Sequence, residues 1–260
     1  MPVLVTGATG LVGRALVREL LSEGAQVRVY LRRDDAELRG AGAHIAVGAA
    51  DDVPRLESAL TRAHTIVHLI GGVWPEAGMS YDLLNRDSTE AAVIAAHAAG
   101  AKRFIFLSFV GADPASPNEF LAAKGRAEEH IISSSFEHAI LRCAPIAEGL
   151  PRTFERLGRG RGAGVPGRGS QGVNPVALSD VVAAIIAADA REAEVRGTWD
   201  LGGPDIVTMD EAAARALPGA KRVRATRSAP KTLLQLYGSD MIADPTAAVA
   251  QFGLALQRAG

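Results

Sequence analysis

The chain is poor in the features that define several classes of protein. It has one cysteine, Cys143, so it can form no intrachain disulfide and no thiolate metal cluster. Its six histidines show no spacing suited to a metal ion. The formal net charge of −1 gives it no general attraction to nucleic acid or to an anionic membrane. We therefore expect no metal site and no nucleic-acid partner.

Long apolar runs are also lacking. None approaches the roughly 18 residues that a membrane-spanning helix needs, so we expect no membrane span. The first residues lead directly into "PVLVTGATG", without the basic segment, apolar segment and cleavage site of a signal peptide. Together these absences predict a cytoplasmic protein.

The chain does contain a regular alternation of short β-branched runs and longer stretches rich in Ala, Leu, Glu and Arg. The runs lie at residues 3–6, 27–31, 44–47, 65–70, 103–108 and 138–142. Strands that are apolar at nearly every position, each followed by a helix, indicate a parallel sheet covered on both faces. The predicted fold class is α/β, a doubly wound, Rossmann-like parallel sheet with a small C-terminal substrate lobe. We place the dinucleotide-binding domain at residues 1–150 and the lobe at 151–260, interleaved with the first in one compact unit.

A glycine-rich turn follows the first predicted strand. In "TGATGLVG" three glycines open a helix that is expected to end at Gly24. Glycines at such a turn let a pyrophosphate approach the backbone N–H groups, and the helix N-terminus adds partial positive charge. The expected dinucleotide contacts here are Gly7, Thr9, Gly10, Leu11, Val12 and Gly13. A plain strand-to-helix turn without a ligand is the alternative.

The spacing T-G-x-x-G-x-x-G resembles that of the extended and atypical short-chain dehydrogenase/reductase superfamily. The resemblance continues through "GAKRFIFLSFVGAD", "NEFLAAKGRAEEHI", "NPVALSDVVAAI" and "GTWDLGGPDIVTMDEAA", and so covers nearly the whole chain. The pattern is most similar to the atypical NAD(P)-binding branch, which includes NmrA-type regulators and an accessory subunit of respiratory complex I. This resemblance implies a bound nicotinamide dinucleotide.

The end of the second predicted strand bears on which dinucleotide binds. It reads "VYLRRDD", with Arg32 and Arg33 where NAD-binding proteins carry an acid. Arg32 aligns with an arginine that similar proteins direct at a 2′-phosphate, which favours NADP(H) over NAD(H). The alternative is a solvated loop in which Asp34 and Asp35 balance the two arginines. Ala49 stands where the family often places an aspartate near the adenine.

The remaining expected cofactor contacts follow the fourth and sixth predicted strands. They are Ile70, Gly71, Gly72, Pro145 and Ile146. The two glycines would let a cofactor lie against the backbone. His68, inside the apolar fourth strand, is interpreted as a structural residue with a hydrogen-bond partner rather than as a base.

The proton-relay residues of the family are incomplete. The family uses a tyrosine, a lysine four residues later and a serine on the preceding strand. Lys124 fits the lysine position, but Phe120 and Phe109 occupy the positions of the tyrosine and the serine. Ser108 comes one residue early, and such an offset on a strand turns a side chain to the other face.

Three roles remain open for Lys124. It could bind the cofactor ribose without chemistry, act alone as a general acid with a pKa lowered by burial, or be an exposed helix lysine. The two phenylalanines would also make the pocket more apolar, which suits a flat hydrophobic ligand.

The C-terminal third carries weaker signals. "GRGRGAGVPGRGSQG" resembles an RNA-binding segment but lacks aromatics, and the family places a glycine and proline hairpin here. Asp180 is expected to cap the helix "VVAAIIAADA", and Cys143 is interpreted as a packing residue.

Two hypotheses from different classes result. One is an NAD(P)-binding protein with a degenerate catalytic site, in which the dinucleotide stabilises the fold or reports redox state to a protein partner. The other is an NADPH-dependent reductase or isomerase of a small apolar carbonyl compound or quinone, with Lys124 as the only protein acid. The two phenylalanines favour the first, while sugar-nucleotide epimerisation would need the missing tyrosine. The sequence leaves the substrate, the partner and any homo-oligomer open.

Overall fold

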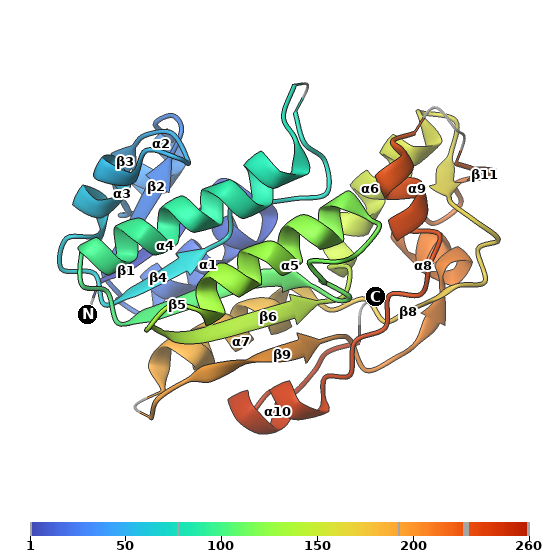
Figure 1. Ribbon diagram of the computed structural model, residues 1–260. Coiled ribbons are helices and arrows are strands. Elements are labelled where there is room, and N and C mark those ends of the chain that lie inside the picture. The colour runs from blue at the N-terminus through green and yellow to red at the C-terminus, as the bar shows by residue number, and fades with distance from the viewer. Residues whose placement is uncertain (1, 77, 192, 226–228, 259–260) are drawn as a thin grey trace.

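The architecture is a parallel sheet between two layers of helices, with a smaller lobe at one end (Figure 1). The structure is a computed structural model that describes residues 2–76, 78–191, 193–225 and 229–258. Seven strands form the sheet in the order β3-β2-β1-β4-β5-β6-β9, and every neighbouring pair is parallel. They are β1 (Val3–Thr6), β2 (Val27–Leu31), β3 (His44–Val47), β4 (Thr65–His68), β5 (Arg103–Phe109), β6 (Glu137–Cys143) and β9 (Arg196–Leu201). The predicted doubly wound α/β fold is confirmed.

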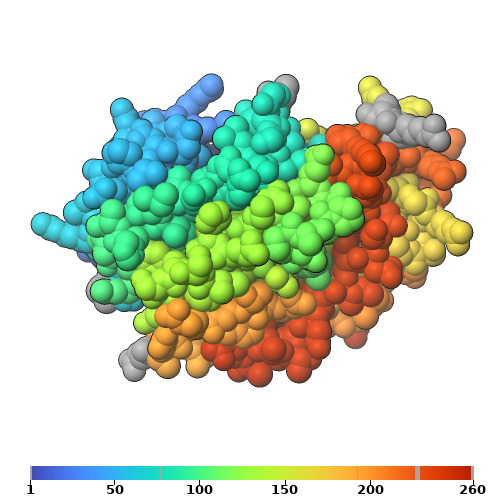
Figure 2. Space-filling view, in the orientation of Figure 1, coloured from blue at the N-terminus to red at the C-terminus, as the bar shows by residue number. Residues whose placement is uncertain are grey.

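Helices cover both faces of the sheet. One face carries α1 (Leu11–Ser22), α7 (Leu178–Ala190) and α10 (Thr246–Phe252). The other carries α3 (Val53–Leu60), α4 (Ser88–Ala98) and α5 (Glu119–Ile132), and in Figure 2 the surfaces of α4 and α5 lie together at the front of the molecule. The short α2 (Ala36–Gly40) joins β2 to β3. Among the described residues, no helix combines the length and the apolar character that crossing a bilayer requires.

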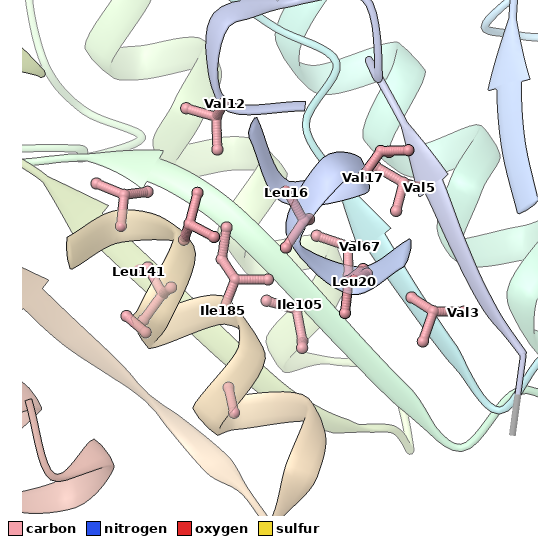
Figure 3. Close-up of a cluster of buried hydrophobic side chains, with 14 of the residues drawn as sticks. Val3, Val5, Val12, Leu16, Val17, Leu20, Val67, Ile105, Leu141 and Ile185 are labelled. Carbon is pink, nitrogen blue, oxygen red and sulfur yellow. The ribbon is translucent and has the colours of Figure 1, made fainter. Parts of the chain in front are cut away.

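The period of the strands explains this layering. Side chains alternate between the two faces, so Val3 and Val5 belong to the core beneath α1 and α7, whereas Leu4 belongs to the core beneath α3 and α4. Figure 3 shows the first of these cores, where Leu16 of α1 and Ile185 of α7 gather with the strand side chains. Because both faces are buried, nearly every strand position must be apolar.

The smaller lobe lies beyond the carboxyl ends of the strands (Figure 1). It comprises the 3-10 turn η2 (Ala147–Gly149), α6 (Leu150–Gly158), β7 (Ala163–Val165), β8 (Gly172–Val173), β10 (Val207–Thr208), α8 (Met209–Ala216), β11 (Arg222–Arg224) and α9 (Lys231–Leu236). A separate apolar core holds these elements against the start of α5. Within the C-terminal third, α7, β9 and α10 return to the central layers, and the domain boundary at residue 150 stays a prediction.

Three local expectations were wrong. The fourth strand ends at His68 rather than at residue 70, since the chain turns away at Gly71, whose φ is +142°. The glycine-rich segment forms no hairpin with itself, because β7 pairs with β11 and β8 pairs with β10. Asp180 does not cap α7: the N-cap is Ala177, and the Asp180 carboxylate accepts the N–H of Gln257 instead, at 2.8 Å.

The turn between β1 and α1 packs tightly against the end of β4. Gly7 has a φ of +67°, in the left-handed region that favours glycine. A Cβ atom built on Gly7 would lie 2.7 Å from the carbonyl carbon and oxygen of Leu69. The turn therefore needs glycine here both for its conformation and for its close approach to the neighbouring strand.

The substitution Gly7→Ala tests this requirement. We expect a loss of about 2 kcal/mol in the free energy of unfolding, because the new methyl group meets backbone atoms in a strained conformation. The melting temperature should fall by about 4–8 °C. Gly40→Ala is the matched control, since a Cβ atom there meets nothing within 4 Å. An unchanged melting temperature for Gly7→Ala would contradict the packing described.

Candidate dinucleotide site

The N-terminus of α1 offers backbone donors without a side-chain cap. Gly10 is the N-cap residue, and no side chain of the described chain accepts a hydrogen bond from the first turn. The turn is closed by the N–H of Gly10 on the carbonyl of Gly7, at 3.0 Å. Leu11, Val12 and Gly13 follow as the first helical residues, with their N–H groups at the positive end of the helix dipole. Thr9, Gly10 and Leu11 are exposed, so the donor set fits an anion such as a pyrophosphate.

The candidate site continues along the ends of β4 and β5. Gly7 lies directly beneath the Leu69 to Ile70 peptide, and the next residue, Gly71, reaches the side chain of Lys124. A Cβ atom built on Gly71 would be 2.9 Å from Lys124 Nζ and 2.8 Å from Asn85 Oδ1. Residues from three distant segments thus meet at one edge of the sheet, and glycine at position 71 allows their close approach.

Lys124 is buried. Only 5% of the residue is exposed, so it is not the solvated helix lysine considered as an alternative. Its Nζ donates to the carbonyl of Leu107 at 2.9 Å and lies 4.5 Å from the centre of the Phe106 ring. Burial lowers the pKa of Lys124 to about 8, and the charge of Glu128 opposes part of this effect. An ammonium group has three donors, and the bond to Leu107 uses one of them.

The two phenylalanines lie together beside the lobe. Phe120 is in the first turn of α5, which Asn118 caps by accepting the N–H groups of Phe120 and Leu121. The Phe120 ring meets Phe109 edge-on at 5.3 Å and Tyr81 at 6.1 Å between centroids. Phe120 is 2% exposed within the apolar core of the lobe. The position of the family's tyrosine is therefore a packed aromatic contact.

The nearby hydroxyl groups are engaged elsewhere. Ser108 donates to Glu128 Oε1 at 2.5 Å, and Glu128 also binds Arg142 at 2.5 Å. The hydroxyl of Tyr81 donates to the carbonyl of Val73 at 3.2 Å. Among the described residues, neither hydroxyl forms a hydrogen bond with Lys124, whose Nζ donates to Leu107 instead.

The arginine at the end of β2 has an unexpected partner. Arg32 binds Glu76 through two hydrogen bonds, of 2.7 and 3.2 Å, from the loop that follows β4. Asp34 pairs with Arg39 and Asp35 pairs with Arg14, so these acids do not balance Arg32 as the alternative supposed. Arg33 and Ala49 are exposed, and the Tyr30 hydroxyl donates to the Ala49 carbonyl at 2.9 Å.

The chain after β6, with Pro145 and Ile146, is held by backbone pairing. Ile146 forms a bridge with Val176, whose N–H donates to the carbonyl of Pro145 at 3.1 Å. Asn174 is buried and donates to the carbonyls of Gly203 and Ala243. The chain after β6 is thereby paired with the segment that leads into α7, and Asn174 joins that segment to the chain after β9.

Asn85 is a site residue that the sequence did not reveal. It is fully buried, accepts the N–H of Gly72 at 3.0 Å and donates to the carbonyl of Tyr81 at 3.0 Å. It lies in the π-helical segment η1 (Asp82–Asp87), a widened turn often found at functional sites. A single polar residue before an alanine-rich helix gives no sequence signal strong enough to find it.

His68 is neutral and structural. Its Nδ1 lies 3.0 Å from the Thr6 hydroxyl, and burial, with a contribution from the charge of Lys124, lowers the pKa of His68 to about 3. Cys143 is also buried, and burial raises the pKa of its thiol. No three metal-ligating side chains come together anywhere in the described ranges.

Comparisons with known proteins identify the family of the chain. Residues 7–189 match the family described as NAD(P)H-binding. Over 222 residues the chain is 31% identical to NADH dehydrogenase (ubiquinone) 1 alpha subcomplex subunit 9, mitochondrial, of Arabidopsis thaliana, covering 80% of this chain and 55% of that one. It is 30% identical to (4-alkanoyl-5-oxo-2,5-dihydrofuran-3-yl)methyl phosphate reductase of Streptomyces griseus, covering 82% and 72%.

The fold is shared with solved structures at low identity. MoeE5 in complex with UDP-glucuronic acid and NAD superposes with a TM-score of 0.77 at 22% identity, covering 99% of this chain and 94% of that one. The chain spans about half the length of the first curated relatives it matches. From the family match and the homology to the complex I subunit, the chain belongs to the NAD(P)H-binding family, in its atypical short-chain dehydrogenase/reductase branch.

Proposed function

We propose that the chain binds NADP(H) at this candidate site, along the carboxyl edge of the sheet, and has weak or no tyrosine-based dehydrogenase activity. The observation that carries the proposal is the burial of Lys124 at the candidate site. The rings of Phe120 and Phe109 take the positions where the family has hydroxyl groups. A lysine can hold a ribose hydroxyl through its spare donors. A phenylalanine can neither donate nor accept the substrate proton.

Different residues would bind different parts of the cofactor. The backbone from Gly10 to Gly13 would hold the pyrophosphate, and Lys124 the nicotinamide ribose. Ile70 to Gly72, together with Pro145 and Ile146, would enclose the nicotinamide end. When bound, the dinucleotide supplies hydride transfer. The protein's part is to orient the ribose and to exclude water with the apolar rings.

The preference for NADP(H) rests on the end of β2. This strand is followed by Arg32 and Arg33 with no acid in the position that binds an unphosphorylated ribose. A guanidinium matches the geometry of a 2′-phosphate and can form two parallel hydrogen bonds with it.

A second candidate function is an NADPH-dependent reductase or isomerase of a small apolar carbonyl compound or quinone. The observation that favours it is the pKa of Lys124, which burial brings to about 8, within the range of a general acid. Lys124 would then be the only protein acid. The name of the Streptomyces griseus relative, a reductase, supports this candidate.

A role without turnover would couple the bound dinucleotide to structure. The relative named as a subunit of NADH dehydrogenase supports a cofactor that stabilises the fold or reports redox state to a protein partner. A homo-oligomer stays a second prediction. Because that relative is named mitochondrial, the cytoplasmic location also stays a prediction.

Restoring the missing hydroxyl tests the degenerate site. We expect the wild-type protein to bind NADPH in a fluorescence titration and to consume it slowly or not at all with a panel of quinones and aldehydes. The variant Phe120→Tyr should raise NADPH consumption at least about tenfold, because a positioned general acid contributes on the order of 10²-fold or more.

Phe136→Tyr is the matched control, since Phe136 is buried at the amino end of β6, whereas the candidate site lies at the carboxyl ends of the strands. Rapid turnover by the wild-type protein, comparable with that of an enzyme with the tyrosine, would contradict the degenerate site. Absence of NADPH and NADH binding would contradict the whole proposal.

The charge of Lys124 gives the binding a pH dependence. The ammonium group is present below a pKa of about 8 and is lost above it, so NADPH affinity should fall about three- to tenfold between pH 7 and 9.5. The stability of the protein without cofactor should change in the opposite direction and rise over the same pH range. Because the unfolded lysine keeps its proton up to about pH 10.4, the unfolded state binds more protons in this window and stability rises with pH.

Lys124→Met should remove both trends, whereas Lys102→Met, at an exposed lysine, should remove neither. Affinity measured by titration and unfolding measured with denaturant at each pH give the two readouts. Affinity that stays constant across this range in the wild-type protein would show that the Lys124 charge does not hold the cofactor.

A further inference from the structure

The loop after β4 brings a carboxylate to the end of β2, forty-four positions away along the chain. Figure 1 shows the described residues of this loop between β4 and α4, near the top of the view. Arg32 Nη2 lies 2.7 Å from Glu76 Oε1, and Arg32 Nη1 lies 3.2 Å from Glu76 Oε2. This two-pronged contact is the one that a guanidinium makes with a phosphate. Glu76 therefore uses the same donors that a 2′-phosphate would need.

The carboxylate is charged at neutral pH. The hydrogen bond from Arg32 and the charge of that guanidinium hold the pKa of Glu76 below its usual value, with a smaller contribution from Arg33. Of the two arginines expected near a 2′-phosphate, Arg32 thus contacts an acid from a distant loop, and Arg33 acts on that acid through its charge alone.

We propose that Glu76 is a cofactor-specificity residue, whose carboxylate competes with the 2′-phosphate of NADP(H) for Arg32. The inference rests on the proposed function, in which Arg32 binds that phosphate. A 2′-phosphate carries close to two negative charges, and it must displace the Glu76 carboxylate to bind the Arg32 guanidinium. NAD(H) has a hydroxyl at this position and leaves the ion pair intact, and a carboxylate there can accept a hydrogen bond from that hydroxyl. Glu76 therefore reduces the ratio of NADPH to NADH affinity that Arg32 would otherwise give.

The loop can release Glu76 by a side-chain rotation alone. The side chains of Arg32 and Glu76 are each 65% exposed, so nothing encloses the pair. Neighbouring contacts are separate from the pair: the centre of the Trp74 ring lies 4.1 Å from the Arg156 guanidinium carbon of α6, and the N–H of Met79 donates to the Glu76 carbonyl at 3.0 Å. An exposed ion pair is weak, so the competition changes affinity by a few-fold and does not block the site.

The substitution Glu76→Gln tests the proposal, because it removes the charge and keeps the shape of the side chain. We expect the dissociation constant of NADPH, measured by fluorescence titration at low ionic strength, to fall about two- to fivefold. That of NADH should stay the same or rise. The dissociation constant of the probe 2′,5′-ADP should fall as that of NADPH does, since the probe carries the 2′-phosphate without the nicotinamide. Glu57→Gln, at an exposed glutamate of α3, is the matched control and should change none of these values.

The double variant Arg32→Ala/Glu76→Gln identifies the route of the effect. If Glu76 acts through Arg32, the double variant should bind NADPH as Arg32→Ala does, at least about tenfold more weakly than the wild type. An NADPH affinity that is unchanged or weaker in Glu76→Gln, while Arg32→Ala still weakens NADPH, would overturn the competition but leave the proposed NADP(H) site intact. If Arg32→Ala leaves the ratio of NADPH to NADH affinity unchanged, the NADP(H) assignment itself is wrong, and the inference falls with it.

Discussion

The seven strands of the central sheet all run in one direction, and the candidate site depends on this constraint. Parallel strands place all their carboxyl ends at the same edge, so residues far apart in the sequence meet there. The turn after β1, the glycines after β4 and Lys124 beside β5 lie at one edge of the sheet for this reason. The apolar core of the smaller lobe, which includes Phe120, lies next to this edge.

Burial of one lysine determines what chemistry this edge can support. Lys124 lies over an aromatic ring, with one carbonyl as a hydrogen-bond partner and a carboxylate one turn further along α5. Such a charge is costly to bury unless a ligand uses its remaining donors. A dinucleotide with ribose hydroxyls and phosphates would use them, whereas the phenylalanines beside the lobe cannot relay a proton. This arrangement is the basis of the proposed binding with little or no turnover.

The sequence predicts those parts of the site that depend on local patterns. The turn from Gly7 to Gly13 is encoded within a few residues, and Lys124 follows Phe120 by one helical turn. The parts that were missed depend on long-range contacts. Asn85 reaches the site because a π-helical turn aims it at Gly72, and no periodic pattern marks such a residue. The partner of Arg32 comes from a loop whose path depends on the packing of the lobe. The helix cap expected at Asp180 failed for a similar reason, since the C-terminal segment supplies a competing N–H donor.

The most direct test of the central claim is a crystal structure of the protein with NADPH. The account predicts density for the pyrophosphate over the turn at Gly10. It also predicts that Lys124 Nζ lies within about 3 Å of a ribose hydroxyl, with no protein hydroxyl at that distance from the nicotinamide ring. A pyrophosphate bound elsewhere, or a tyrosine or serine hydroxyl directed at the nicotinamide, would contradict it.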